Sequence, residues 1–320
     1  MKKIVSISYI RVLAMLMVVM LHSLCYYGNW GFTECVIASF QHFSSLLNDI
    51  SMPVFFCISG YLFVKGVESR DRNTLSFYKD KFRRLIIPYL IWGGVQILLI
   101  PDRYCLKQLF FGVSHLWFLL TLFWIFILMF SLKKYWSLFT VTQYIILIIV
   151  LIPFYHLSKL SHNFLRISSV IRFLPYFLIG IMIYKNLIVN SVFIRRIILG
   201  ISAITLIIVK FYIGDIFNEY ISFDLVRLLS LLMVYFLFDL LLRLNYNKSR
   251  SIEFLDGLSM GIYILHHIII MFFLQFESVR LFLNTYWKIG PVLIFIVSLV
   301  SSCLLTLLLK NNKFTNIIIG

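Results

Sequence analysis

The sequence predicts an all-α integral membrane protein with about ten transmembrane helices. The chain has 320 residues, of which 61% are hydrophobic and 13% are charged; an ordinary soluble domain has roughly 45–50% apolar and about 25% charged residues. The apolar residues come in uninterrupted blocks, and about 20 residues of helix are needed to span the hydrocarbon core of a bilayer. Uninterrupted blocks also exclude a transmembrane β-barrel, because its strands alternate apolar and polar side chains.

The apolar blocks place the helices along the chain with short connections between them. We expect transmembrane helices near residues 4–27, 43–64, 85–101, 115–132, 138–155, 169–188, 193–212, 221–243, 259–275 and 290–309. The first block follows a basic start, MKKIVSISYIRVLAML, which would also suit a signal peptide. We interpret it as a transmembrane helix, because the apolar run is long, contains Arg11 and His22, and is not followed by a small-residue cleavage pattern. The sequence contains no linker or low-complexity tract, so we expect one transmembrane domain over residues 1–320.

The positive charge of the chain indicates its orientation in the membrane. The net charge of +16 would suggest a nucleic-acid partner in a soluble protein. With the N-terminus in the cytoplasm, 19 of the 29 lysine and arginine residues fall in inner segments and seven in outer segments. Cytoplasmic segments of membrane proteins carry such an excess of positive charge. We therefore predict that both termini are cytoplasmic, and we expect no nucleic-acid partner.

The five cysteines do not predict a metal site. They are Cys25, Cys35, Cys57, Cys105 and Cys303, and none forms a CxxC pair. We interpret them as small packing residues, as expected for cysteines within or beside apolar helices.

Several ionisable side chains fall inside the predicted spans, where each costs roughly 2.5–3.5 kcal/mol on insertion scales and marks a candidate functional site. They are Arg11, His22, Arg172, Asp224, Arg227 and Asp239. Asp224 and Arg227 are three residues apart and could neutralise each other on one helix face. Asp239 is placed to pair with Arg243. Arg172 lies near the expected outer surface, where it could extend towards the headgroups or bind an acidic group.

Arg11 and His22 share one face of the first predicted helix. Eleven residues correspond to about 1100°, or three turns plus roughly 20°, and place the two side chains roughly 16 Å apart along the axis. Arginine is a permanent cation, and histidine exchanges a proton near neutral pH. The pair could therefore combine an anion-binding group with a base. Alternatively, His22 is an interfacial residue and Arg11 extends to the headgroups.

A basic segment, KDKFRRLIIPY, precedes the third predicted helix. The positive-inside bias accounts for its charge. Lys81, Arg83 and Arg84 could also form a phosphate clamp at a helix start. The two interpretations are compatible.

Six sequence blocks carry a resemblance to a known family. In chain order they are YIRVLAMLMVVMLH, MPVFFCISGYLF, KFRRLIIPYLIW, HLWFLLTLF, FLPYFLIGIMIY and SMGIYILHHIII. Together they resemble the membrane-bound acyltransferase 3 family, which O-acylates glycans and related molecules. One departure is at Pro53 and Val54, where many relatives carry an acidic residue; the nearest acid here is Asp49.

The resemblance implies an acyl-CoA donor, most often acetyl-CoA, and a hydroxyl acceptor on a cell-surface glycan or its lipid-linked precursor. It implies a bacterial cytoplasmic membrane enzyme with His22 as general base. Arg11, Arg83 and Arg84 would hold the phosphates of the donor. Ser59, Trp117 and Tyr263 are candidate donors to the oxyanion that forms on the thioester.

Three further residues, Tyr61, Arg172 and His266, are expected to bind substrate. His266 and His267 point about 100° apart on a helix. We therefore expect one of them to face the site, and the family block selects His266. No metal is expected.

Two other functions remain open. A transporter or flippase for a glycan precursor would also have many helices and buried charges, but it would typically show two matching halves with broken helices. A glycan polymerase or ligase would require a large outer loop. The ordered blocks favour the acyltransferase, with the transporter as the alternative.

Overall fold

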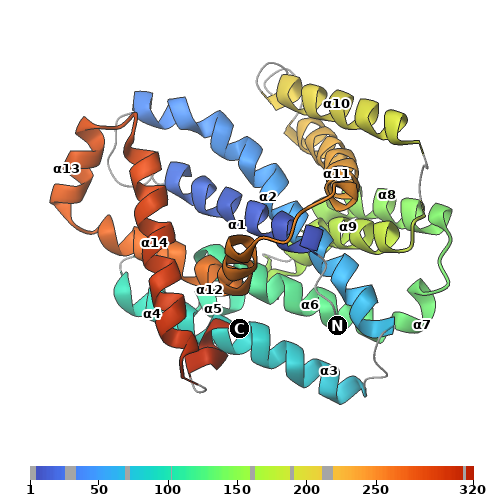
Figure 1. The fold of residues 1–320 in the computed structure, drawn as a ribbon, viewed down its shortest axis with the longest axis horizontal. Coiled ribbons are helices and arrows are strands. Elements are labelled where there is room, and N and C mark those ends of the chain that lie inside the picture. The colour runs from blue at the N-terminus through green and yellow to red at the C-terminus, as the bar shows by residue number, and fades with distance from the viewer. Residues whose placement is uncertain are drawn as a thin grey trace.

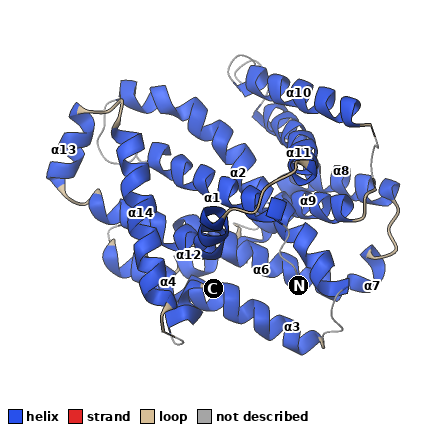
Figure 2. Cartoon of the chain, viewed as in Figure 1, coloured by secondary structure: helices blue, strands red, loops and turns tan. Residues whose placement is uncertain are grey.

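The structure is a computed structural model that describes residues 5–25, 34–68, 73–101, 103–158, 163–187, 191–210, 219–312 and 315–320. These residues form helices and the turns that connect them, and no strand occurs among them (Figure 2). The predicted all-α class is confirmed.

Each of the ten predicted segments overlaps a helical region of the described chain. The helices are α1 (Val5–Cys25), α2 (Glu34–Glu68), the continuous run α3 (Thr74–Lys81), η2 (Phe82–Ile86) and α4 (Ile87–Leu99), α6 (Trp117–Ser131), α8 (Val141–Ser158), α9 (Ile167–Tyr184), α10 (Val192–Ile208), α11 (Glu219–Arg243), α12 (Arg250–Phe273) and α14 (Gly290–Lys310). Eight helical regions of the described chain are long and apolar enough to cross a membrane. The other two predicted spans correspond to α10, with 17 residues, and to the apolar part of α8.

Shorter helices connect the long ones. They are α5 (Gln108–Phe111), η3 (Ser114–Leu116), α7 (Lys133–Trp136), η5 (Phe164–Arg166), α13 (Glu277–Thr285) and η7 (Thr315–Ile319). Figure 1 shows α1, α12 and α14 on one side of the molecule and α8 to α11 on the other, with α2 between them. In keeping with this, α2 packs against α1, α9 and α11, and α1 packs against α12 and α14.

Two glycines let α2 and α9 cross in direct backbone contact. A Cβ on Gly60 would overlap the backbone of Phe177, and a Cβ on Gly180 would overlap the backbone of Cys57 and Tyr61. Small residues at a helix crossing permit this close approach in membranes, where van der Waals packing drives helix association. The glycines of the SGYL and LIG motifs therefore have a packing role.

Two prolines inside the same helices release backbone carbonyls that α11 then satisfies. A proline has no N–H for the carbonyl four residues earlier, so Pro53 of α2 releases the carbonyl of Asp49 and Pro175 of α9 releases that of Ile171. Ser230 donates to the Asp49 carbonyl at 2.6 Å, and Arg227 donates to the Ile171 carbonyl at 3.1 Å. Two polar side chains of α11 thus replace backbone hydrogen bonds that would otherwise be missing in the hydrocarbon region.

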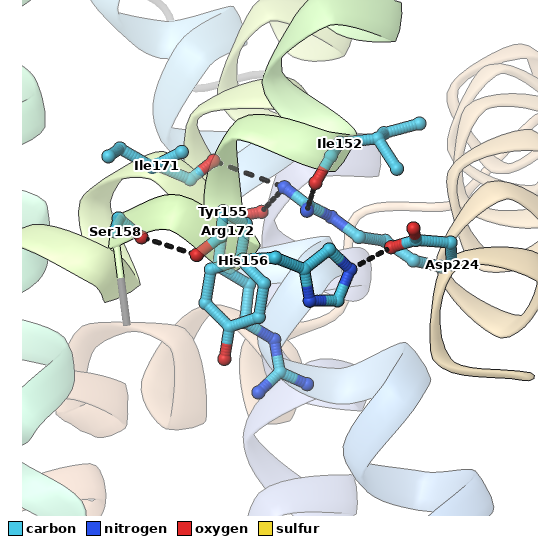
Figure 3. A network of polar contacts seen from close by, with 8 residues as sticks. Ile152, Tyr155, His156, Ser158, Ile171, Arg172 and Asp224 are labelled. Atoms are coloured by element: carbon cyan, nitrogen blue, oxygen red, sulfur yellow. Dashed lines mark hydrogen bonds and ion pairs between the residues drawn. The ribbon is translucent and has the colours of Figure 1, made fainter. Parts of the chain in front are cut away.

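The ion pairs in the spans differ in part from the sequence prediction. Asp239 pairs with Arg243 at 3.0 Å, as predicted, and also with Arg195 at 2.6 Å. The predicted Asp224–Arg227 pair was wrong. Asp224 contacts Nε2 of His156 at 2.8 Å (Figure 3), whereas the Arg227 guanidinium donates to carbonyls of α8 and α9.

The basic segment lies within a helical run and not at its start. The run begins at Thr74, where the Asn73 side chain accepts a hydrogen bond from the Leu75 N–H. Arg83 and Arg84 belong to the π-helical turn that follows. The predicted placement of these cations at a helix start is therefore wrong, because the N–H groups there are already used by helical hydrogen bonds.

Some residues used in the charge and cysteine predictions lie outside the part that the structure describes. They are Lys2, Lys3, Arg70, Arg72, Lys159, Lys313 and the side chain of Cys35. Among the described residues, no group of histidine, cysteine and acidic side chains could hold a metal ion.

Candidate active site

Four histidines from three parts of the chain form a cluster. His22 comes from α1, His115 from η3, and His266 and His267 from α12. The ring centroid of His22 lies 5.9 Å from that of His115, 5.1 Å from that of His266 and 4.9 Å from that of His267. His22 is partly exposed, whereas the other three are buried. We call these four residues the histidine cluster.

The hydrogen bonds around His22 select one tautomer. Nδ1 of His266 lies 2.9 Å from the Ile262 carbonyl, so Nδ1 carries the proton and Nε2 of the same ring is an acceptor. Nδ1 of His22 lies 3.2 Å from that Nε2 and 3.0 Å from the Val18 carbonyl. Both neighbours of this nitrogen are acceptors, so Nδ1 of His22 carries the proton. Nε2 of His22 therefore has the lone pair, and it makes no hydrogen bond to a described residue.

His115 uses both ring nitrogens to connect helices. Its Nε2 lies 3.0 Å from the Ile264 carbonyl and therefore donates. Its Nδ1 then accepts from the Gln96 amide at 3.3 Å. The Tyr263 hydroxyl donates to the backbone carbonyl of His115. His115 thus joins α4, η3 and α12, and this leaves His22 as the better candidate for a base.

Both adjacent histidines of α12 reach the cluster. Nε2 of His267 lies 3.0 Å from the Ser114 hydroxyl, and its ring stacks on that of His115 at 4.4 Å. The prediction that only one of His266 and His267 faces the site was therefore wrong. Side chains 100° apart on one helix can flank a third ring that lies between their directions, and His22 occupies that position.

A cavity of about 450 Å³ lies beside the Arg11 end of α1, opposite the end that carries His22. Its cationic lining residues are Arg11, Lys81 and Arg84, and Asp256 of α12 also lines it. Arg11 and Asp256 form an ion pair of 2.6 Å, in which the Arg11 side chain is 27% exposed and that of Asp256 is fully buried. Ser8 also donates to Asp256 at 2.8 Å. We call this space the Arg11 cavity.

Aromatic rings close the Arg11 cavity on the side of the histidine cluster. Phe55, Phe118 and Tyr263 line it, and their ring centroids lie 5.3–6.3 Å apart. Tyr263 belongs to both regions, since it lines the cavity and its hydroxyl binds the carbonyl of His115. The cavity therefore extends from charged groups at one end to an aromatic wall that contacts the histidine cluster.

The structure brings part of the predicted site together here. Arg11, Arg84, Ser59 and Tyr263 line the Arg11 cavity, and His22 and His266 contact each other. Ser59 donates to the Phe55 carbonyl of its own helix at 2.8 Å, and the Tyr263 hydroxyl is likewise used as a donor. Neither hydroxyl is oriented as a donor to an oxyanion.

Other predicted residues lie elsewhere. Arg83 is exposed and does not line the cavity. Tyr61 lies on another face of α2, packed against Tyr184 and Phe238. Trp117 packs against Phe173 and Arg166.

Arg172 lies beside a different pocket, between α2, α9, α10 and α11.

The sequence interpretation missed several site residues. They are His115, Asp256 and Gln96, whereas His267 was considered and set aside in favour of His266. His115 opens the HLWFLLTLF block and could have been singled out there. Asp256 precedes the predicted span at 259–275 but lies inside α12, which begins at Arg250.

Comparison with known proteins gives one match. A family model described as an acyltransferase domain matches residues 4–310. No curated protein matches the chain, and no solved structure matches it.

Proposed function

The chain belongs to the acyltransferase 3 family and is a membrane acyltransferase, and we propose that it transfers an acetyl group from acetyl-CoA to a hydroxyl of a cell-surface glycan or its lipid-linked precursor. The bacterial cytoplasmic membrane would hold it with both termini on the cytoplasmic side. The observation that carries the proposal is the lone pair on Nε2 of the partly exposed His22 ring, which makes no hydrogen bond to a described residue and is fixed by two acceptors on Nδ1.

His22 acts as the general base in this proposal. As the acceptor hydroxyl oxygen attacks the thioester carbonyl carbon, Nε2 of His22 takes the hydroxyl proton. The tetrahedral intermediate then collapses, the carbon–sulfur bond breaks, and the CoA thiolate leaves and takes the proton from Nε2 of His22, which regenerates the base. A positioned base contributes about 10²–10⁴ to the rate of such a step.

The Arg11 cavity is the proposed donor site. CoA carries phosphates at one end of a long pantetheine arm and the thioester at the other. Arg11, Lys81 and Arg84 supply cations suited to phosphate oxygens. The apolar lining suits the pantetheine arm and directs it towards Tyr263 and the histidine cluster.

The geometry of α1 supports this arrangement. Arg11 and His22 lie eleven residues apart on one continuous helix, which corresponds to roughly 16 Å. Arg11 faces the cavity and His22 faces the cluster. A donor bound from the cytoplasm and an acceptor approaching from outside could then meet at His22 without CoA crossing the membrane.

A complementation experiment tests the proposed reaction. Cell-surface glycans from a deletion strain should lack a mass increment of one acetyl group, and the wild-type gene should restore it. His22→Gln should fail to restore it at equal membrane abundance. An unchanged glycan mass profile in the deletion strain would contradict the acetyltransferase proposal.

A further inference from the structure

A second cavity, of about 390 Å³, lies across α2 from the histidine cluster. Its polar and aromatic lining comes from α2, α9 and α11, with Lys210 following α10. The α2 residues that line it flank Leu47, which packs in one apolar cluster with Leu21 and Leu24 of α1, so the cavity lies towards the His22 end of α1. We call it the Arg172 pocket.

The lining of the Arg172 pocket has more positive than negative side chains. Three cations, Arg172, Arg227 and Lys210, and one carboxylate, Asp49, line it. Lys210 pairs with Asp49 and also donates to Ser45. Arg227 donates to three backbone carbonyls at 2.9–3.1 Å, so its position is fixed by the fold.

Among the described residues, the guanidinium of Arg172 has neither a carboxylate partner nor a hydrogen bond, whereas Lys210 has a carboxylate and Arg227 has three carbonyls. Its guanidinium lies 5.2 Å from the ring centroids of both Phe173 and Phe223, which hold it by cation–π contacts. Figure 3 shows Arg172 beside His156 and Asp224, which are joined to each other. A charge in a membrane span with no counter-ion is costly and indicates a functional site.

We propose that the Arg172 pocket binds an oxyanion, a carboxylate or phosphate, carried by the glycan acceptor. The planar guanidinium would bind the two oxygens of such a group side by side. Aromatic walls with a few polar side chains, here Tyr176 and Ser222, are typical of a small-ligand pocket. The inference rests on the proposed function, since it assigns the acceptor to the class of acidic glycans.

Direct binding to the purified protein in nanodiscs of neutral phosphatidylcholine tests this proposal. The probes are a galacturonic acid tetramer, neutral maltotetraose and acetyl-CoA, each measured by calorimetry. We expect the acidic tetramer to bind at least about tenfold more tightly than the neutral one, because a hydrogen bond to a charged group adds to its affinity. Equal binding of the two tetramers to the wild-type protein would overturn the proposal.

Variants assign the preference to Arg172. Arg172→Gln should remove the preference for the acidic tetramer, and Arg172→Lys should keep part of it. Arg103→Gln removes an exposed cation outside the pocket and should change nothing. An unchanged preference in Arg172→Gln would overturn the assignment.

Two further readouts separate this proposal from its alternatives. Adding anionic phosphatidylglycerol to the nanodiscs should leave the acidic tetramer bound. Displacement of the tetramer by this lipid would assign the pocket to a lipid headgroup and overturn the glycan proposal. Acetyl-CoA should bind wild type and Arg172→Gln equally. A wild-type protein that binds the tetramer but not acetyl-CoA would contradict the proposed donor site while leaving the Arg172 pocket supported.

Discussion

Nδ1 of His22 lies 3.2 Å from Nε2 of His266, although 244 residues separate them in the chain. His266 is held by its own hydrogen bond to the Ile262 carbonyl, so its Nε2 is a fixed acceptor. The contact orients the His22 ring and keeps its proton on Nδ1. His266 is therefore a positioning residue for the proposed base.

Substituting His266 tests this role. His266→Ala removes the acceptor and should lower kcat by about fivefold, since one hydrogen bond contributes about 1 kcal/mol and each 1.4 kcal/mol is about tenfold in rate. The KM for acetyl-CoA should not change. His266→Gln can still accept through its amide oxygen and should retain most of the activity in steady-state assays. Equal losses in the two variants would mean that His266 does not act through the acceptor nitrogen.

Asp256 and Arg11 should behave as one unit in donor binding. Arg11→Gln removes a phosphate-binding cation, and Asp256→Asn removes the charge that orients it, so each should weaken acetyl-CoA binding by at least about tenfold. The double variant should be little worse than either single variant, because contacting residues couple by about 0.5–3 kcal/mol. Equilibrium binding measures this cycle, with the exposed Lys79→Gln as control. Fully additive losses of affinity would mean that Arg11 and Asp256 act independently in donor binding.

Gly180 should be required for the crossing of α2 and α9. Gly180→Ala places a methyl group against the backbone of Cys57 and Tyr61, which cannot rotate away. Overpacking costs typically about 1–3 kcal/mol, and we expect a clearly lower midpoint of thermal unfolding. Gly94→Ala is the matched control, because nothing lies within 4 Å of its added Cβ. Equal stability of the two variants would contradict the packing role.

Arg227 and Pro175 should be coupled through the Ile171 carbonyl. Arg227→Met leaves that carbonyl without a donor and should lower the unfolding midpoint, because an unsatisfied buried polar group costs about 1–3 kcal/mol. Pro175→Ala restores a backbone N–H that can reach the same carbonyl. The loss caused by Arg227→Met should therefore be smaller in a Pro175→Ala background. Thermal unfolding of the four proteins gives the coupling, and additive effects would contradict it.

The helices could be predicted from the sequence because each apolar block is long enough to identify a membrane span without knowledge of its tertiary contacts. The shared face of Arg11 and His22 also followed from helical geometry within one segment. The partners of these residues could not be predicted in the same way. Asp256 and His266 reach α1 only through the packing of α12, which depends on contacts between distant segments.

The errors have a similar origin. Asp224 and Arg227 have the spacing of an ion pair, but the carbonyl released by Pro175 and the imidazole of His156 provide other partners. The helical run that contains Arg83 begins at Thr74, in a polar stretch where hydropathy gives no signal. Local patterns thus predict the spans, and tertiary contacts decide which polar groups meet.

The most direct test of the account measures donor binding and acyl transfer in the same preparation of His22→Gln. The glutamine can still donate from its amide, but it provides no basic nitrogen. We predict that acetyl-CoA binds to this variant as tightly as to wild type, while transfer to the glycan falls by about 10²–10⁴. Full transfer activity in His22→Gln would contradict the assignment of His22 as the base.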